Sequence, residues 1–91
     1  MLVEVSDEFA ENYSHFCSKN ASFKKAVDDK IEQLKLVLSD YPNHFKPLRG
    51  PLKGFRRVHV FSSFVIIFQF FEKEKIIRLI SLAHHDKAYD A

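Results

Sequence analysis

The 91-residue sequence has no tryptophan, one cysteine, two glycines and three prolines. A single cysteine, Cys17, excludes an internal disulfide and suits a reducing compartment. The low glycine and proline content, with 46% apolar residues, argues against a disordered chain. A chain of this length is enough for one domain, which we predict to span residues 1–91.

Long apolar runs are also missing. The longest, Phe64–Phe68, is far shorter than the ~20 residues that a helix needs to cross a membrane. The first residues, Met1–Val5, include an acid and lack the apolar stretch of a signal peptide. We therefore predict a soluble, cytoplasmic protein without a membrane partner.

Acidic residues are missing between Asp40 and Glu72, although the sequence has 12 of them. Five of its 14 lysines and arginines lie in that interval: Lys46, Arg49, Lys53, Arg56 and Arg57. The rest of the chain is therefore acidic on balance, although the whole has a formal charge of +2. This asymmetry predicts a face that binds a polyanion.

The first two-fifths of the chain predicts a strand and two helices. Leu2–Val5 is typical of a short edge strand, and Ser6 can cap a following helix. That helix has the apolar stripe Phe9, Tyr13, Phe16 and Cys17. After Asn20, a second stripe comprises Phe23, Val27, Ile31, Leu34, Leu38 and Tyr41. Pro42 should end this helix, so we expect an antiparallel helix pair.

The second half predicts turns and strands. Glycines and prolines in 46–54 indicate turns, and strands follow at 55–61, 64–71 and 76–83. Their connections near Ser62 and Lys73 have hairpin length. We predict an α+β fold of order β-α-α-β-β-β, with the N-terminal strand and helix pair packed on one face of an antiparallel sheet.

Two histidine-containing motifs could support chemistry. Arg57 and His59 are two apart on a predicted strand, so they face one way about 7 Å apart. A cation beside an imidazole can bind a phosphate and move a proton, although a solvated strand face is an open alternative. His84-His85-Asp86 with Tyr89 could transfer protons, with Asp86 orienting either ring, or form a polar tail on which Tyr89 packs back.

Other classes of site find less support. The loop cations Lys46, Arg49 and Lys53 could contact phosphates or simply be solvated. The five histidines include no pair at i,i+4 spacing and there is no second cysteine, so we predict no metal site and no cofactor. A phosphate-cradling glycine motif and a serine-hydrolase elbow are both missing.

The order of these segments resembles the RelE/ParE toxin superfamily along the whole chain. The segments that carry the resemblance are Leu48-Arg49-Gly50, Arg57–Val60, Ile66-Ile67-Phe68 and His85–Tyr89. The resemblance implies a RelE-like fold and the toxin of a type II toxin–antitoxin system. RelE-like members are metal-independent, ribosome-dependent mRNA endonucleases in which the mRNA 2′-hydroxyl attacks its own phosphate. The implied partners are a cognate antitoxin, the ribosomal A site and mRNA.

The resemblance also implies roles for individual residues. Arg57 and His59 match two lysines of RelE, and the second is a histidine in YafQ-like toxins. His85 matches an arginine of RelE and a histidine of YafQ-like toxins, Tyr89 matches a C-terminal aromatic residue, and Lys46 matches a YafQ-like histidine. The implied catalytic residues are Arg57, His59, His85 and Tyr89, and those implied to bind RNA phosphates are Lys46, Arg49, Lys53 and Arg56.

Three departures from the family pattern leave the expected cationic site with fewer charged side chains. Val65 and Ser81 stand where many RelE-like or YafQ-like members have arginine, and Ser63-Phe64 replaces an Asp-Trp pair. Fewer donors would then stabilise charge in the transition state. Two alternatives to an endonuclease therefore stay open: a ParE-like gyrase inhibitor, and a catalytically inactive toxin that serves as a partner-binding module.

Overall fold

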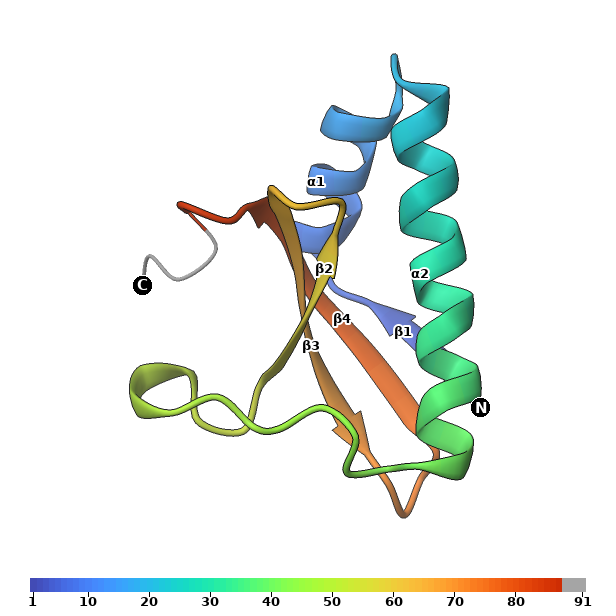
Figure 1. The fold of residues 1–91 in the computed structure, drawn as a ribbon, viewed down its shortest axis with the longest axis vertical. Helices are drawn as coiled ribbons and strands as arrows, with labels where there is room; N and C mark the ends of the chain where they lie inside the picture. The colour runs from blue at the N-terminus through green and yellow to red at the C-terminus, as the bar shows by residue number, and fades with distance from the viewer. Residues whose placement is uncertain (88–91) are drawn as a thin grey trace.

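The computed structural model describes residues 1–87, and its elements have the predicted order (Figure 1). They are β1 Leu2–Val5, α1 Asp7–Cys17, α2 Ala21–Asp40, the short 3₁₀ helix η1 Gly50–Leu52, β2 Arg56–Val60, β3 Phe64–Phe71 and β4 Ile76–His84. The α+β fold class is confirmed. Turns were expected throughout 46–54, and η1 adds one 3₁₀ turn there, beginning beside Pro51.

Both helices begin at the capping residues that the sequence indicates. Ser6 Oγ accepts a hydrogen bond from the Phe9 amide, and Asn20 Oδ1 accepts one from the Phe23 amide, each at 3.0 Å. The second helix ends at Asp40, so Tyr41 lies beyond it and is 67% exposed rather than part of the apolar stripe. Within the described residues, neither helix has the length and apolar character needed to cross a bilayer.

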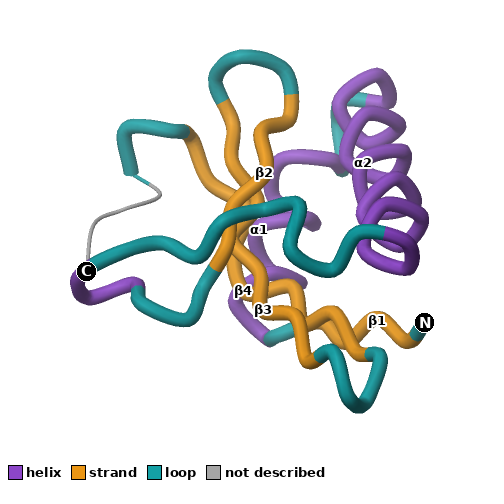
Figure 2. The backbone as a smooth tube through the Cα atoms, turned by 60° about the horizontal axis from the view of Figure 1, so that its bottom comes forward, coloured by secondary structure: helices purple, strands orange, loops and turns teal. Residues whose placement is uncertain are grey.

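The sheet has the order β1-β4-β3-β2, with β1 and β2 at opposite edges (Figure 2). The β2–β3 and β3–β4 pairs are antiparallel, as their hairpin links require. The β1–β4 pair is parallel, so the sheet is mixed and the expectation of an all-antiparallel sheet was wrong in this detail. The long connection from β1 through both helices to the other strands imposes no antiparallel direction.

The hydrophobic core lies between the sheet and the two helices, which cover one face (Figure 1). Its largest fully buried side chain is Phe68 on β3, and Leu34 and Leu38 reach it from α2. Burial of each such side chain contributes about 1.5–3 kcal/mol to stability. On the same strand Val65 and Ile67 are only 0% and 3% exposed although they lie outside this cluster. The prediction that this strand is covered on both faces is thus confirmed.

Two side chains of the α1 region hold β4 where β1 no longer pairs with it. Strand β1 pairs with β4 only as far as Leu79. Beyond that point Ser6 Oγ donates to the Ile80 carbonyl at 2.7 Å, and Asn12 Oδ1 accepts from the Leu82 amide at 3.0 Å. These bonds satisfy backbone groups that would otherwise lack a strand partner. They also fix the C-terminal half of β4, which leads to the second histidine motif.

Candidate functional site

Strand β2 divides its side chains between the two faces of the sheet. Val58 and Val60 point into the core, whereas Arg57 and His59 are exposed on the face away from the helices, which we call the outer face. The predicted alternation is therefore confirmed. It places a guanidinium and an imidazole side by side on one strand, with the core beneath them.

The strand register shows what lies beside these two residues. His59 is opposite Val65, which is opposite Ala83, and Arg57 is opposite Ile67, which is opposite Ser81. Residues opposite one another on neighbouring strands share a face, so Val65 and Ser81 lie in the same rows as the two candidate residues. Two of the three family departures thus fall inside the site. On β3 and β4, the residues in these two rows carry no charge.

Arg56, by contrast, belongs to the helix side of the sheet. Its Nη1 donates to the Pro42 carbonyl at 2.6 Å, and its guanidinium carbon lies 5.7 Å from the centre of the Phe70 ring. The hydrogen bond ties the segment after α2 to the sheet, and the ring contact joins β2 to β3. The structure therefore does not bring Arg56 together with Arg57 and His59.

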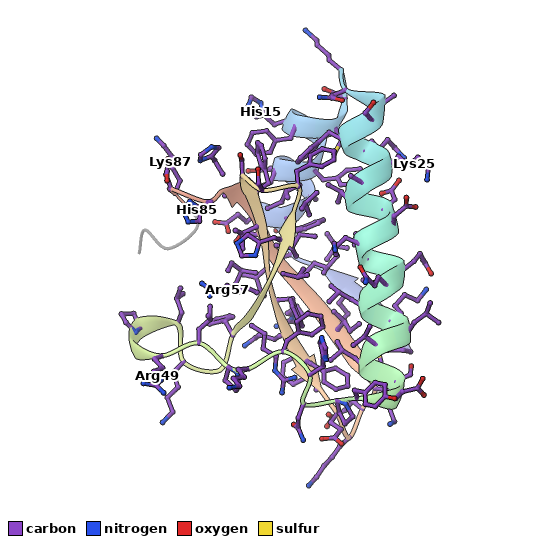
Figure 3. All side chains as sticks on the ribbon, in the orientation of Figure 1. His15, Lys25, Arg49, Arg57, His85 and Lys87 are labelled. Carbon is purple, nitrogen blue, oxygen red and sulfur yellow. The ribbon has the colours of Figure 1, made fainter. Side chains whose placement is uncertain are left out.

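The loop between α2 and β2 carries the other predicted phosphate-binding residues, Lys46, Arg49 and Lys53, all exposed. The loop is braced by the Phe45 ring, 5.7 Å from that of Phe68, and by a hydrogen bond from the Leu48 amide to the Phe55 carbonyl at 2.8 Å. In Figure 3, Arg49 and Arg57 both lie on the side of the sheet away from α2. The loop thus adds cations to the same side of the molecule.

Two glycines allow this loop to turn. Gly50 has a φ of +68° and Gly54 a φ of +93°, values that side chains with a Cβ rarely adopt. The amide of Lys53, between them, donates to the Gly50 carbonyl at 3.0 Å. The glycines therefore shape the exposed end of the loop that presents Arg49 and Lys53.

His85 reaches the outer side from the end of β4. His84 is opposite Phe64 and stacks edge-on against its ring, with 5.5 Å between ring centres. His85 is the first residue beyond β4, and Figure 3 shows it on the side of the sheet away from α2. The His85 amide donates to the Ser63 carbonyl at 2.6 Å. Ser63, the third departure from the family, therefore contributes a backbone group that any residue would supply. Tyr89 lies outside the described residues.

The register places the end of β4 near His59. Ala83 lies two strand spacings from His59, so their Cα atoms are about 10 Å apart across the sheet. His85 follows two residues later, in the turn beyond β4. Two imidazoles in these positions could reach a single phosphodiester from opposite sides.

Other chemistries find no support in the described part of the chain. No group of three or more His, Cys, Asp or Glu in residues 1–87 is placed to hold a metal ion. Cys17 is buried, and this burial raises the pKa of its thiol, which makes it a poor nucleophile. An apolar cavity of about 330 Å³ lined by Val3, Phe9 and Tyr13 lies on the helix side, away from Arg57 and His59.

Comparisons with known proteins agree with the fold. The model of the family described as "ParE toxin of type II toxin-antitoxin system, parDE" matches residues 3–89. "Putative toxin RelE4" of Methanocaldococcus jannaschii is 38% identical over 65 residues, which cover 71% of this chain and 65% of that protein.

Two solved structures share the architecture. The YoeB/ParE toxin from Agrobacterium tumefaciens has a TM-score of 0.78 at 14% identity, over 93% of this chain and 99% of that one. YafQ in the DinJ-YafQ complex of E. coli has a TM-score of 0.70 at 20% identity, over 96% of each chain.

Proposed function

This chain belongs to the ParE toxin family of type II toxin–antitoxin systems, in the RelE/ParE superfamily, and we propose that it is a ribosome-dependent mRNA endonuclease. The observation that supports this function best is the placement of Arg57, His59 and His85. The first two are exposed on the outer face of β2, and the third follows β4 on the same side (Figure 3), where its amide donates to the Ser63 carbonyl.

The proposed reaction needs two proton transfers and one charge stabiliser, which matches these three residues. One histidine removes the proton of the mRNA 2′-hydroxyl as that oxygen attacks the adjacent phosphorus. The other gives a proton to the departing 5′-oxygen, which leaves a cyclic phosphate and a 5′-hydroxyl. Each transfer typically contributes about 10²–10⁴-fold to the rate. Arg57 stabilises the charge on the phosphate oxygens, and Tyr89 stacks on or positions the RNA.

Lys46, Arg49 and Lys53 take a supporting role in this proposal. Because they are exposed on the loop beside the outer face, they suit contacts to phosphates on either side of the cleaved bond. Such contacts add affinity without reading sequence. Arg56 has no place in the proposed interface, since its guanidinium is engaged on the helix side.

A cognate antitoxin is the other partner that we propose, alongside mRNA and the ribosomal A site. The family is that of toxins from type II toxin–antitoxin systems, and YafQ, a structural neighbour, is seen in a complex with DinJ. Shielding of the basic outer face would silence this chain. Co-purification of the chain with the product of a neighbouring gene, and loss of toxicity on its co-expression, would support the pairing.

Primer extension on mRNA from translating ribosomes tests the endonuclease. The native chain should produce new ends within A-site codons, and His59→Ala or His85→Ala should remove them while circular dichroism shows an intact fold. His15→Ala is the matched control, because His15 is also exposed but lies on α1, at the far end of the molecule from Arg49 (Figure 3). Growth arrest by the native chain without any new mRNA ends would contradict the proposal.

Gyrase inhibition is the second candidate. It is favoured by the uncharged rows beyond β2, where Val65 and Ser81 leave fewer donors for a phosphate than the RelE-like pattern implies. It predicts accumulation of gyrase–DNA cleavage complexes after induction, with mRNA intact. A chain that leaves growth untouched would instead act as a partner-binding module.

A further inference from the structure

The residues after β4 form a hydrogen-bonded turn that holds one imidazole. The Lys87 amide donates to the His84 carbonyl at 2.8 Å, which closes a β-turn with His85 and Asp86 at its two central positions. The His85 amide donates to the Ser63 carbonyl at 2.6 Å. The backbone that carries His85 is therefore attached both to the turn and to the β2–β3 connection.

His84 is held in one tautomer by the same turn. The Asp86 amide donates to Nδ1 of His84 at 3.3 Å. Because a backbone amide can only donate, this Nδ1 must be the unprotonated nitrogen, and the proton of neutral His84 lies on Nε2. Oδ2 of Asp86 also lies 3.6 Å from this Nδ1, but the distance is long and an unprotonated nitrogen forms no ion pair. The Asp86 carboxylate therefore forms no hydrogen bond with neutral His84.

The same carboxylate contacts the ring of His85. Nδ1 of His85 lies 3.2 Å from Oδ1 of Asp86. An ionised carboxylate can only accept, so Nδ1 of His85 carries the proton and Nε2 carries the lone pair. The two adjacent histidines are thus set in opposite tautomers by one residue. We propose that Asp86 is a positioning residue that fixes the tautomer and orientation of His85, so that Nε2 is the atom of His85 that exchanges a proton with the RNA.

This inference rests on the proposed endonuclease and names the atom through which one of its two histidines acts. One transfer removes the proton of the 2′-hydroxyl as the 2′-oxygen forms its bond to phosphorus. The other gives a proton to the 5′-oxygen as its bond to phosphorus breaks. Nε2 of His85 carries out one of them and His59 the other. In either role His85 is an imidazolium before or after its transfer, and the Asp86 carboxylate stabilises that form through Nδ1. Asp86 itself touches neither the RNA nor the reacting atoms.

Nitrogen NMR on the purified chain without RNA tests the positioning directly. The ¹⁵N shifts of His85, recorded at a pH where the ring is neutral, should show a protonated Nδ1 and an unprotonated Nε2. Asp86→Ala should abolish this preference, whereas Lys87→Ala, in the same turn, should leave it unchanged. A native His85 protonated on Nε2, or a tautomer that ignores Asp86→Ala, would overturn the proposal.

Single-turnover cleavage on programmed ribosomes tests the consequence for the rate. Asp86→Ala should lower the rate at saturating toxin about 10-fold or more, with the half-saturation concentration nearly unchanged, because orientation of the imidazole is lost while binding is kept. Asp86→Glu should recover part of the rate. A variant that raises only the half-saturation concentration would contradict a positioning role.

The two experiments separate this inference from the proposed function. If the native chain cuts no mRNA, the endonuclease fails, and the His85 tautomer still decides whether Asp86 positions the ring. If the native chain cuts and Asp86→Ala cuts equally well, the endonuclease stands and Asp86 has no part in it.

Discussion

Arg56 and Arg57 are adjacent and chemically identical, yet the sheet places them in different environments. Arg56 lies on the helix side, where it donates to the Pro42 carbonyl and packs against Phe70. Arg57 lies on the outer face beside His59. His84 and His85 form a second doublet that divides in the same way, since His84 packs on Phe64 and His85 follows on the other face.

In each of these pairs, one residue packs against the core and stabilises the fold, while its neighbour lies on the outer side and is available for binding or catalysis. Successive side chains of a strand point to opposite faces, so two identical neighbours cannot share a role. On the helix side, an arginine or histidine is used for packing. On the outer face, the same residue type meets the solvent, where a polyanion can reach it.

The largest effect that we expect separates the two arginines. Arg57→Ala should lower mRNA cleavage about 10²–10³-fold, because it removes a donor that stabilises transition-state charge. Its free energy of unfolding should fall less than that of Arg56→Ala, because Arg57 is exposed. Single-turnover cleavage and urea unfolding measure the two quantities.

Arg56→Ala is the matched comparison and should show the reverse. Cleavage should stay within a few-fold of the native rate, whereas stability should fall by about 1–3 kcal/mol because the Pro42 carbonyl loses a charged donor. If Arg56→Ala lost activity at unchanged stability, the division of roles between the two faces would be wrong.

A gain of function should follow from restoring charge to the outer face. Ser81 is partly exposed and lies in the same row as Arg57, with Ile67 between them. Ser81→Arg should therefore raise the cleavage rate about 10-fold by adding a donor near the phosphate, while Ser81→Gln should raise it less. A Ser81→Arg variant that folds normally and cuts no faster would show that charge in this row does not limit the reaction.

A smaller effect is expected from the loop. With catalysis blocked by His85→Ala, replacing Lys46, Arg49 and Lys53 by alanine should weaken binding to single-stranded RNA. The slope of log affinity against log salt should decrease by about 0.7 for each phosphate that the loop no longer neutralises. Lys25→Ala on α2 is the control for charge, since Lys25 lies on the helix side of the sheet (Figure 3). Because the loop variant removes three charges and Lys25→Ala removes one, a loss from Lys25→Ala of about a third of the loop variant's would mean that binding depends on net charge alone.

The smallest effect concerns the helix pair. Tyr13 and Lys24 donate to Asp28 at 2.7 and 2.9 Å. Partial burial raises the pKa of Asp28, but these two hydrogen bonds outweigh it and hold the pKa below its usual value. A depressed carboxyl pKa stabilises the fold above the unfolded-state pKa, and this contribution is lost as the pH falls through the folded-state value.

Asp28→Asn should therefore cost about 1 kcal/mol or less at pH 7, since the Lys24 and Asp28 side chains are 54% and 42% exposed and solvent screens their attraction. Urea unfolding at a series of pH values should show the gap between native and variant chains closing under acid conditions. A gap that persists unchanged to low pH would indicate that packing, rather than the charge of Asp28, causes the loss.

Much of the fold was predictable because local signals agree with the tertiary structure. Ser6 and Asn20 cap helices where the sequence indicates, and the alternation around Arg57 and His59 follows the period of a strand. The parallel β1–β4 pair was missed because strand pairing across two helices has no local signature. The Asn12 bond to Leu82 was missed for the same reason, as it joins residues 70 positions apart.

The candidate site was less predictable than the fold. The pattern indicates that Arg56 and Arg57 alternate, but the Pro42 carbonyl that holds Arg56 lies in a loop whose path only the structure gives. The rows that join Arg57 to Ser81 and His59 to Val65 depend on a register with an irregularity between Ile67 and Phe68, and a shift of one residue would have moved every side chain to the other face.

The ends of the cleaved mRNA test the central claim most directly. Regulated expression of the native chain, followed by mapping of mRNA ends by position and by end chemistry, should yield cuts in A-site codons. These should carry 5′-hydroxyls downstream and cyclic phosphates upstream, and they should disappear with His59→Ala. Translation arrest without new ends, ends that carry 5′-phosphates, or cuts that persist in the His59→Ala variant would contradict the assignment of the outer face as the catalytic site.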